Sequence, residues 1–203
     1  KAAIGKDRPD YVFHLAAVSS VGQSFDKGVE TFTINVIGTK NVYEAIRGKN
    51  WLKKVVFVSS SDVYGPIKPE NLPLKPNNLF NPISPYAYSK AAAEYLSRMY
   101  REQYDIPLVI VRAFNHTGPR QSPDFVIPSF CQKIVAAEKT RGKKTVAVGN
   151  LKVKRDICDV RDIVRGYRLL AEKCVPGEDY HLCSGRAYGI GELLGRLLSW
   201  SDP

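Results

Sequence analysis

Short apolar runs alternate along this chain with longer stretches in which apolar residues recur at helical spacing. The strongest apolar runs are residues 10–17, 54–60 and 107–114, and residues 28–47 and 86–104 are the amphipathic stretches between them. Unbroken apolar runs of this length are typical of strands buried on both faces of a sheet, and a period near 3.6 is typical of helices that cover such a sheet. The pattern therefore predicts an α/β fold.

The segments that connect the three predicted strands are too long for hairpins and long enough for helical crossovers. We therefore expect a doubly wound, Rossmann-like parallel sheet. Residues 66–85 are rich in Pro and Asn and are expected to form an irregular loop. After residue 115 the pattern loosens. The elements expected there are helices at 125–139, 160–173 and 190–199 and strands at 145–149 and 178–184.

Composition allows one large domain, or one domain with a small appendage. Of the 203 residues, 44% are hydrophobic, and no window reaches the roughly 18 uninterrupted apolar residues that a membrane span requires. The first residues, Lys1 to Asp7, contain no apolar stretch that resembles a secretory signal. We therefore expect a soluble, cytoplasmic protein with no membrane partner.

The net charge of +10 raises nucleic-acid binding as an alternative. The basic residues are densest in two short, loop-like stretches, 141–144 and 152–155, and no zinc-finger spacing or RNA-binding signature accompanies them. Positive charge is equally suited to a site for a di-anionic small molecule. We favour that interpretation and expect no nucleic acid as a partner.

The cysteines give no indication of metal or redox chemistry. The chain has four of them, scattered between residues 131 and 183, and none forms a C-x-x-C pair. We expect free, buried thiols and no metal site.

Candidate chemistry lies in two short motifs, SSSDVYG at residues 59–65 and SPYAYSK at residues 84–90. Ligands of doubly wound sheets bind beyond the carboxyl ends of strands, which is where the serines of the first motif stand. In the second motif, Tyr86 and Lys90 lie four residues apart at the start of a predicted helix. They therefore share one face of that helix, about 6 Å apart along its axis.

This spacing favours a proton relay. A nearby ammonium lowers the pKa of a phenol, and a shift from about 10 towards 7 corresponds to about 4 kcal/mol. We therefore expect Lys90 to lower the pKa of Tyr86, so that the phenol exchanges a proton near neutral pH. Tyr88 competes for this role, but no lysine stands four residues after it.

Five motifs occur in the order and spacing found in the extended short-chain dehydrogenase/reductases that act on nucleotide sugars. They are HLAA at 14–17, N-x-x-G-T at 35–39, SSSDVYG, SPYAYSK, and R-x-F-N at 112–115. The chain resembles this family over nearly its whole length. The resemblance implies NAD or NADP as cofactor, a nucleotide sugar as substrate, and a homodimer formed through the helices near 28–47 and 86–104.

Later stretches narrow the resemblance. They are FNHTGPRQS, FVIPSF, VGN with RDICDVRDIVRGY, and PGEDYHLCSG. They are most similar to the members that reduce the 4-keto group of a GDP-linked 6-deoxyhexose and so form GDP-D-rhamnose. Nucleotide-sugar 4,6-dehydratases and 4-epimerases share the earlier motifs, and both activities stay open as alternatives.

The resemblance also implies a division of the chain. Residues 1–115 would be the remainder of a dinucleotide-binding Rossmann domain. Residues 116–203 would mostly form a smaller α/β region that binds the nucleotide sugar, with the stretch 156–183 returning to the large sheet.

By the same resemblance, Tyr86 is the proton donor, Lys90 lowers its pKa and holds the nicotinamide ribose, and Ser60 bonds to the reacting carbonyl. Further cofactor contacts are expected from Leu15, Ala16, Ala17 and Phe114. The substrate diphosphate would be bound by Asn115, Arg155 and Arg186, and a planar guanidinium suits that bidentate role. Asn35 would be structural and brace adjacent strands.

Asp62 favours reduction over dehydration. Dehydratases of the family that the chain resembles carry a glutamate two residues after the catalytic Ser or Thr and use it as a base towards the sugar ring. An aspartate places its carboxylate roughly 1.5 Å further back, and a misplacement of about 1 Å can cost about a hundredfold in rate. Reduction needs no such base.

The glycine-rich fingerprint that presents helix amides to a cofactor pyrophosphate is absent from the sequence. The glycines between residues 185 and 195 lack its spacing. We expect the chain to begin near the fourth strand of the fold, to leave that strand as a sheet edge, and to stop without a closing element. NAD and NADP are therefore not distinguished, and a non-catalytic module that binds sugar nucleotides or self-associates is an alternative of another class.

Overall fold

The computed structural model describes residues 2–140 and 144–201, and the basic stretch noted at 141–144 falls largely outside them. Two compact units make up the chain. The first comprises the residues up to Phe114 together with Val164–Leu182, and the second comprises Asn115–Ile163 and the residues from Cys183 onward.

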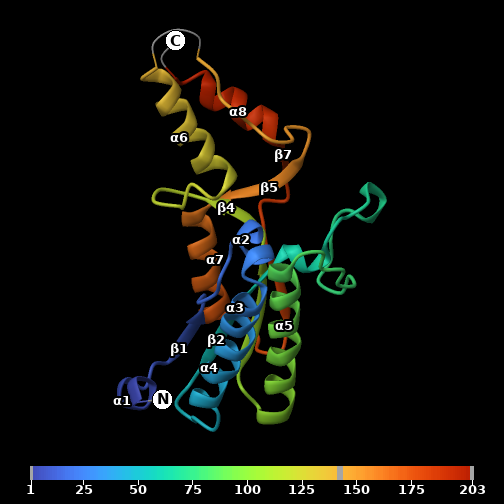
Figure 1. The fold of residues 1–203 in the computed structure, drawn as a ribbon. Coiled ribbons are helices and arrows are strands. Elements are labelled where there is room, and N and C mark those ends of the chain that lie inside the picture. Colours follow the sequence, from blue (N-terminus) through green and yellow to red (C-terminus); the bar gives the residue numbers. More distant parts are fainter. Residues whose placement is uncertain (1, 141–143, 202–203) are drawn as a thin grey trace. The chain divides into compact units, whose positions relative to one another are not determined.

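A parallel four-stranded sheet forms the centre of the first unit (Figure 1). Its strands are β1 (Tyr11–His14), β2 (Lys54–Ser60), β3 (Leu108–Ala113) and β6 (Asp179–Leu182), in the order β1-β2-β3-β6. The register pairs Val55 with Leu108 and runs to the pair of Ser60 with Ala113. Strands β2 and β3 are buried almost throughout, which explains their unbroken apolar sequences. The predicted parallel α/β sheet is confirmed.

Helices α3 (Gly28–Phe32), α4 (Gly38–Ile46) and α5 (Pro85–Tyr104) lie side by side on one face of this sheet (Figure 1). Their core with the sheet includes Tyr43, Phe57, Tyr100 and Leu108. The remaining helical segments are α1 (Ala2–Asp7), α2 (Val21–Asp26), the short 3₁₀ turns η2 (Ser61–Tyr64) and η3 (Pro69–Asn71), and α7 (Val160–Lys173), which belongs to this unit from Val164 on.

The start of α5 is fixed by its sequence. Ser84 is the N-cap, and its hydroxyl accepts a hydrogen bond from the amide of Ala87 at 3.1 Å. Pro85 occupies the first helical position, where the missing N–H is no loss. At the other end, Asp105 adopts a left-handed conformation with φ of 51°. The predicted helix at 86–104 is therefore confirmed almost residue for residue.

The predicted helix at 28–47 is not one continuous α-helix. Residues Thr33–Ile37 form a π-helical turn, η1, between α3 and α4. The buried Asn35 in this turn hydrogen-bonds to residues outside the helix, and π turns of this kind often occur at functional positions. Tertiary hydrogen bonds therefore override the regular helical pattern here.

The second unit consists of a three-stranded sheet and two helices. Strands β4 (Asn115–Thr117), β5 (Lys154–Asp159) and β7 (Ala187–Gly189) are ordered β4-β5-β7, with β4 parallel and β7 antiparallel to β5. Helices α6 (Val126–Glu138) and α8 (Ile190–Leu198) share an apolar core that includes Phe130, Ile134 and Leu194.

Two expectations about this part of the chain need correction. Residues 145–149 were predicted as a strand, but they form none. Val146 packs against the α6 and α8 core, and the Ala147 carbonyl accepts a bond from Lys133, so no strand partner is used. Of the stretch 156–183, only the residues from Val164 to Leu182 belong with the large sheet, because β5 pairs with β4 and β7.

Candidate active site

Ser60, Tyr86 and Lys90 are all buried near the carboxyl end of β2. Ser60 is the last residue of β2, and Tyr86 and Lys90 lie in the first two turns of α5. Their exposed fractions are 8%, 9% and 5%. The Tyr86 phenol forms a hydrogen bond with the Ser60 side chain, and the Lys90 ammonium donates to the Val58 carbonyl of β2. The structure thus brings together three of the residues singled out in the two motifs.

The backbone of Tyr86 is held by side chains from distant segments. Its amide donates to the Ser24 hydroxyl at 3.1 Å, and its carbonyl accepts from the Ser89 hydroxyl at 2.7 Å. Ser89 in turn accepts at 2.8 Å from Asn35, whose side chain also bonds to both backbone groups of Val18. Asn35 therefore connects the segment after β1 to the first turn of α5, rather than bracing adjacent strands.

Burial keeps the Tyr86 phenol protonated. It raises the pKa of Tyr86 to about 12, the hydrogen bond with Ser60 opposes this rise, and the carboxylate of Asp62 adds to it. We expected Lys90 to lower this pKa, and for this structure that prediction is wrong. The Lys90 ammonium is directed to the Val58 carbonyl and lies 4.8 Å from the centre of the Phe57 ring.

Lys90 is itself a perturbed group. Burial lowers the pKa of its ammonium to about 8, and the carboxylate of Glu94, one helical turn further along, raises it. A cation buried to this degree needs a nearby negative charge or hydrogen-bond acceptors. Glu94 and the Val58 carbonyl provide both.

Asp62 lies close enough to act on Tyr86, because its charge contributes to the raised pKa of that phenol. It stands in η2, directly after β2, and its backbone amide donates to the Ser60 hydroxyl at 3.2 Å. Ser60 thus caps η2 with its side chain while its hydroxyl also bonds to Tyr86.

His14 was not singled out as a site residue, although it begins the HLAA motif. It is 6% exposed at the end of β1, and its Nε2 lies 2.8 Å from the Thr39 hydroxyl. Burial and the charge of Lys90 lower the pKa of His14 to about 4. The imidazole is therefore neutral at physiological pH. In the sequence, its position at the start of the HLAA motif was the one signal that pointed to this residue.

The proposed cofactor-contact residues lie at strand ends of the first unit. Leu15, Ala16 and Ala17 follow β1, and the Leu15 side chain is 53% exposed. Phe114 follows β3, and its ring is 5.4 Å from that of His181. Ser59 lies beside Ser60, and within the described residues its buried hydroxyl has no hydrogen-bond partner.

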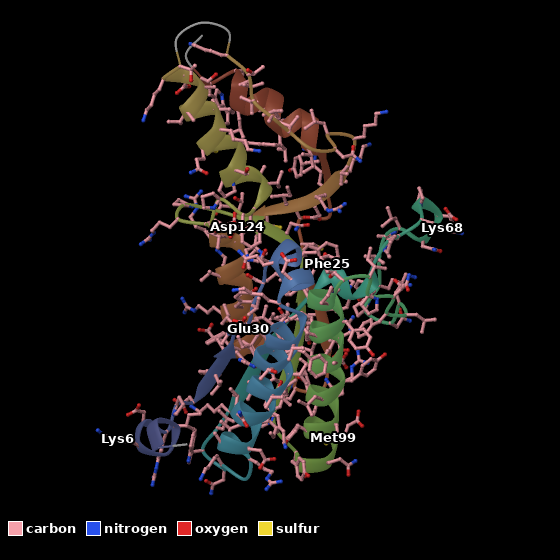
Figure 2. The ribbon with its side chains drawn as sticks, viewed as in Figure 1. Lys6, Phe25, Glu30, Lys68, Met99 and Asp124 are labelled. Carbon is pink, nitrogen blue, oxygen red and sulfur yellow. The ribbon has the colours of Figure 1, made fainter. Side chains whose placement is uncertain are left out.

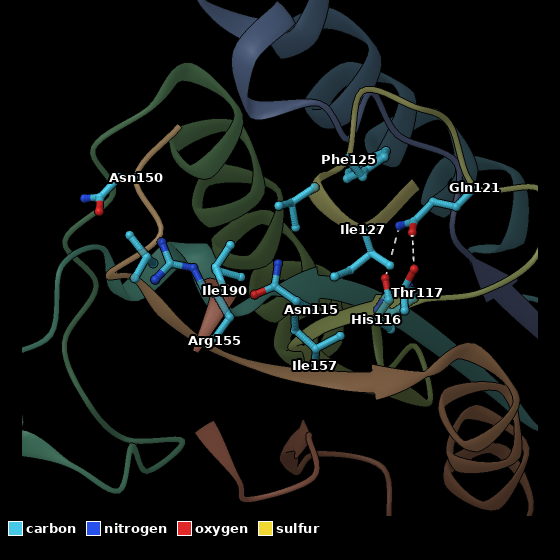
Figure 3. A pocket seen from close by; sticks show the side chains of 12 residues that line it. Asn115, His116, Thr117, Gln121, Phe125, Ile127, Asn150, Arg155, Ile157 and Ile190 are labelled. Carbon is cyan, nitrogen blue, oxygen red and sulfur yellow. Dashed lines mark hydrogen bonds between the residues drawn. The ribbon is translucent and has the colours of Figure 1, made fainter. Parts of the chain in front are cut away.

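Asn115 and Arg155 line one pocket of about 260 Å³ in the second unit (Figure 3). Strands β4 and β5 supply these two residues, and the segment leading into α6 supplies Gln121 and Phe125. Phe125 is the N-cap of α6 and makes no side-chain capping bond, so the first turn of that helix carries uncapped amides at the pocket. A helix N-terminus and a guanidinium both favour an anionic ligand.

Arg186 does not line this pocket. Its guanidinium stacks 5.1 Å from the centre of the Tyr188 ring, and its backbone belongs to a turn held by Asp156. The Asp156 carboxylate accepts from the amides of Ser184 and Gly185 at 3.0 and 2.7 Å. Asp156, the residue that follows Arg155 in β5, thus links β5 to this turn.

The cysteine side chains lie at or near the surface. The four cysteines are free thiols, but Cys131 and Cys183 are exposed and the other two are half-buried, so the prediction of buried thiols is wrong. Residues 2–140 and 144–201 hold no group of three or more His, Cys, Asp or Glu placed to bind a metal ion. No described helix is both long and apolar enough to cross a membrane.

Comparison with known proteins gives concordant results. The family model described as GDP-mannose 4,6 dehydratase matches residues 1–198. GDP-6-deoxy-D-mannose reductase from Pseudomonas aeruginosa is 34% identical over 189 residues, which are 93% of this chain and 62% of that enzyme. GDP-mannose 4,6 dehydratase from Dictyostelium discoideum is 31% identical over 201 residues, which are 98% of this chain and 55% of that enzyme.

A solved structure agrees with these sequence matches. The structure of RMD from Pseudomonas aeruginosa complexed with NADPH superposes with a TM-score of 0.87 at 33% identity and covers 93% of this chain and 63% of that one. The chain therefore spans less than two thirds of the length of these relatives.

Proposed function

The chain belongs to the GDP-mannose 4,6-dehydratase family of the extended short-chain dehydrogenase/reductases, and from this premise we propose that the protein reduces the 4-keto group of a GDP-linked 6-deoxyhexose with NADH or NADPH. Relatives in this family include nucleotide-sugar dehydratases, reductases and epimerases. The observation that carries the proposal is the hydrogen bond between Tyr86 and Ser60 at the end of β2, together with the buried ammonium of Lys90, which donates to the same strand.

The residues at the strand ends fit a nicotinamide cofactor. Leu15 is exposed after β1, and the buried Ser59 hydroxyl lacks a hydrogen-bond partner in the described chain. Buried polar atoms are normally paired, so Ser59 marks a position where a polar group of a ligand would be favourable. In this proposal Leu15, Ala16, Ala17 and Phe114 contact the cofactor, and Lys90 holds its ribose. The bound cofactor supplies the hydride that is added to C4.

Tyr86 supplies the proton that balances the hydride. Its pKa of about 12 means that the phenol carries its proton at neutral pH, as an acid must before reduction. When the hydride adds to C4, this proton passes to the sugar O4 and leaves a phenolate. The Ser60 hydroxyl orients the carbonyl oxygen, and its hydrogen bond to Tyr86 stabilises the phenolate.

The pocket of the second unit is proposed to bind the nucleotide diphosphate. Arg155 brings a guanidinium to the pocket, Asn115 a carboxamide, and α6 the positive end of its dipole. A diphosphate matches these groups in charge and in hydrogen-bond geometry. Arg186 is proposed at most as a peripheral contact, because it stacks on Tyr188 and does not line the pocket.

Asp62 supports reduction over dehydration. Its shorter side chain would hold a carboxylate back from a sugar ring by roughly one carbon–carbon bond length. Its negative charge also keeps the proton on Tyr86, which suits a proton donor. We therefore place 4,6-dehydration and 4-epimerisation second.

A homodimer is proposed through α3 to α5. Several apolar side chains of these helices are exposed to solvent: Val29, Phe32, Tyr95 and Met99 have exposed fractions of 85%, 40%, 57% and 38%. Met99 lies towards the C-terminal end of α5 (Figure 2). Light scattering of the purified chain measures the mass directly. A monomer at micromolar concentration would contradict the proposed dimer.

Calorimetric titration tests the two proposed binding functions separately. NADH, NADPH and GDP-mannose are titrated into the purified chain, with UDP-glucose as the control nucleotide sugar. The proposal expects GDP-mannose to bind more tightly than UDP-glucose and at least one reduced cofactor to bind. Binding of GDP-mannose alone would assign the redox activity to a longer protein, and no binding of either ligand would contradict the proposed function.

A further inference from the structure

The Gln121 side chain holds β4 beside the pocket. Its amide nitrogen donates to the His116 carbonyl at 3.1 Å, and its amide oxygen accepts from the Thr117 hydroxyl at 2.7 Å (Figure 3). A carbonyl oxygen only accepts hydrogen bonds, so the nitrogen must face His116 and the oxygen must face Thr117. Both ends of the carboxamide are therefore committed to the same short strand.

Strand β4 is short and lies at a sheet edge. It contains only Asn115–Thr117 and lies at the edge of the sheet ordered β4-β5-β7. Within the described chain, β5 is the strand that pairs with it, from Asn115 opposite Ile157 to Thr117 opposite Asp159. Gln121 thus provides hydrogen bonding that a further neighbouring strand would otherwise provide.

A tight turn places Gln121 for this task. Its backbone amide donates to the Gly118 carbonyl at 3.3 Å, and Arg120 before it has a φ of 71°. Gly118 is required here, because an added Cβ would lie 2.4 Å from a methyl group of Val160. The turn is therefore fixed by packing, and the return of the Gln121 side chain onto β4 closes it.

We propose that Gln121 is a positioning residue for the nucleotide-sugar pocket, and that it acts by bracing β4 so that Asn115 faces the diphosphate in a fixed direction. This inference rests on the proposed function of the pocket. Gln121, Asn115 and Thr117 all line that pocket, so a shift of β4 changes its wall directly. The role differs from a direct contact because it is exerted through Asn115.

The first test compares Gln121→Met with Gln132→Met by titration with GDP-mannose. Methionine has a similar length, is uncharged and cannot form either hydrogen bond, while Gln132 is an exposed residue of α6 outside the pocket lining. The loss of two hydrogen bonds is expected to weaken binding about tenfold in Gln121→Met. Gln132→Met is expected to bind as the unaltered protein does.

A double-variant comparison separates bracing from direct contact. If Gln121 acts through Asn115, adding Gln121→Met to Asn115→Ala should weaken GDP-mannose binding less than about twofold further. A full tenfold loss in the Asn115→Ala background would overturn the proposal. Equal affinity of Gln121→Met and the unaltered protein would overturn it as well.

Amide hydrogen exchange tests the brace without any ligand. Peptides that contain residues 114–118 are expected to exchange at least several-fold faster in Gln121→Met. Peptides that cover only the part of β5 paired with β7 should keep their exchange rate. Unchanged exchange at 114–118 would overturn the proposal even if the variant bound GDP-mannose less tightly. Failure of the unaltered protein to bind GDP-mannose would instead contradict the proposed function. The exchange rates would then still show whether Gln121 stabilises β4.

Discussion

Arg112 and Glu94 form an ion pair from which water is excluded. The Arg112 Nε donates to both carboxylate oxygens of Glu94 at 3.1 Å, and both side chains are 0% exposed. Arg112 also donates to the Tyr64 hydroxyl and to the Pro76 carbonyl. Because Glu94 raises the pKa of Lys90, this pair forms part of the support behind the candidate active site.

Removing Arg112 should strongly destabilise the first unit. Arg112→Met leaves the Glu94 carboxylate buried with less compensation, a change that typically costs about 3–5 kcal/mol. Urea unfolding followed by circular dichroism measures the free energy of unfolding. The matched control is Arg168→Met, which removes an exposed pair with Glu172 at 2.7 Å and should change stability little. Equal losses for the two variants would contradict this account of the buried pair.

Lys90 should make the protein more stable as the pH rises from about 8 to about 10. Its pKa in the folded state is about 8, below the unfolded value of 10.5, so between these values the unfolded chain binds the extra proton. The free energy of unfolding therefore rises with pH in this window. Above about pH 10 the raised pKa of Tyr86 acts in the opposite direction.

The difference between the unaltered protein and Lys90→Met isolates this contribution from other titrating groups. Chemical unfolding at pH 7.5, 8.5 and 9.5 should show Lys90→Met as the more stable of the two at the lowest pH, with the gap closing as the pH rises. A difference in the free energy of unfolding that is the same at all three pH values would show that Lys90 does not change its protonation state between pH 7.5 and 9.5.

Gly65 should tolerate no side chain. Its φ is 65° and its ψ is −151°, a region open almost only to glycine, and an added Cβ would lie 1.9 Å from the Asn81 carbonyl oxygen. Gly48 also has a positive φ, of 71°, but has no atom within 4 Å of the added Cβ. Gly65→Ala should therefore lower the melting temperature clearly more than Gly48→Ala. Similar melting temperatures would mean that the approach of Asn81 does not matter.

Much of the first unit could be predicted from the sequence because its signals are local. Strands β2 and β3 are unbroken apolar runs, and α5 begins with Ser84 and Pro85, a cap and a helix-starting proline. The spacing of Tyr86 and Lys90 likewise placed them on one face of α5. These features depend on neighbours within a few residues.

What the sequence did not reveal depends on distant partners. The π turn exists because Asn35 bonds to Val18 and to Ser89, which is 54 residues away. The raised pKa of Tyr86 results from burial, which helical spacing alone does not report. The roles of His14 and Gln121 depend on contacts that only the structure shows. The exclusion of Arg186 from the pocket follows from its stacking on Tyr188.

Reduction of a GDP-linked 4-keto-6-deoxyhexose by the protein and by Tyr86→Phe tests the central claim most directly. NADPH and NADH consumption is followed at 340 nm, and the product sugar is identified by chromatography. The account predicts reduction by the unaltered protein and a loss of at least about a hundredfold in kcat for Tyr86→Phe, which lacks the proton to be donated. Tyr88→Phe, the neighbouring phenol, should keep its activity. Equal activity of Tyr86→Phe and the unaltered protein would contradict the account.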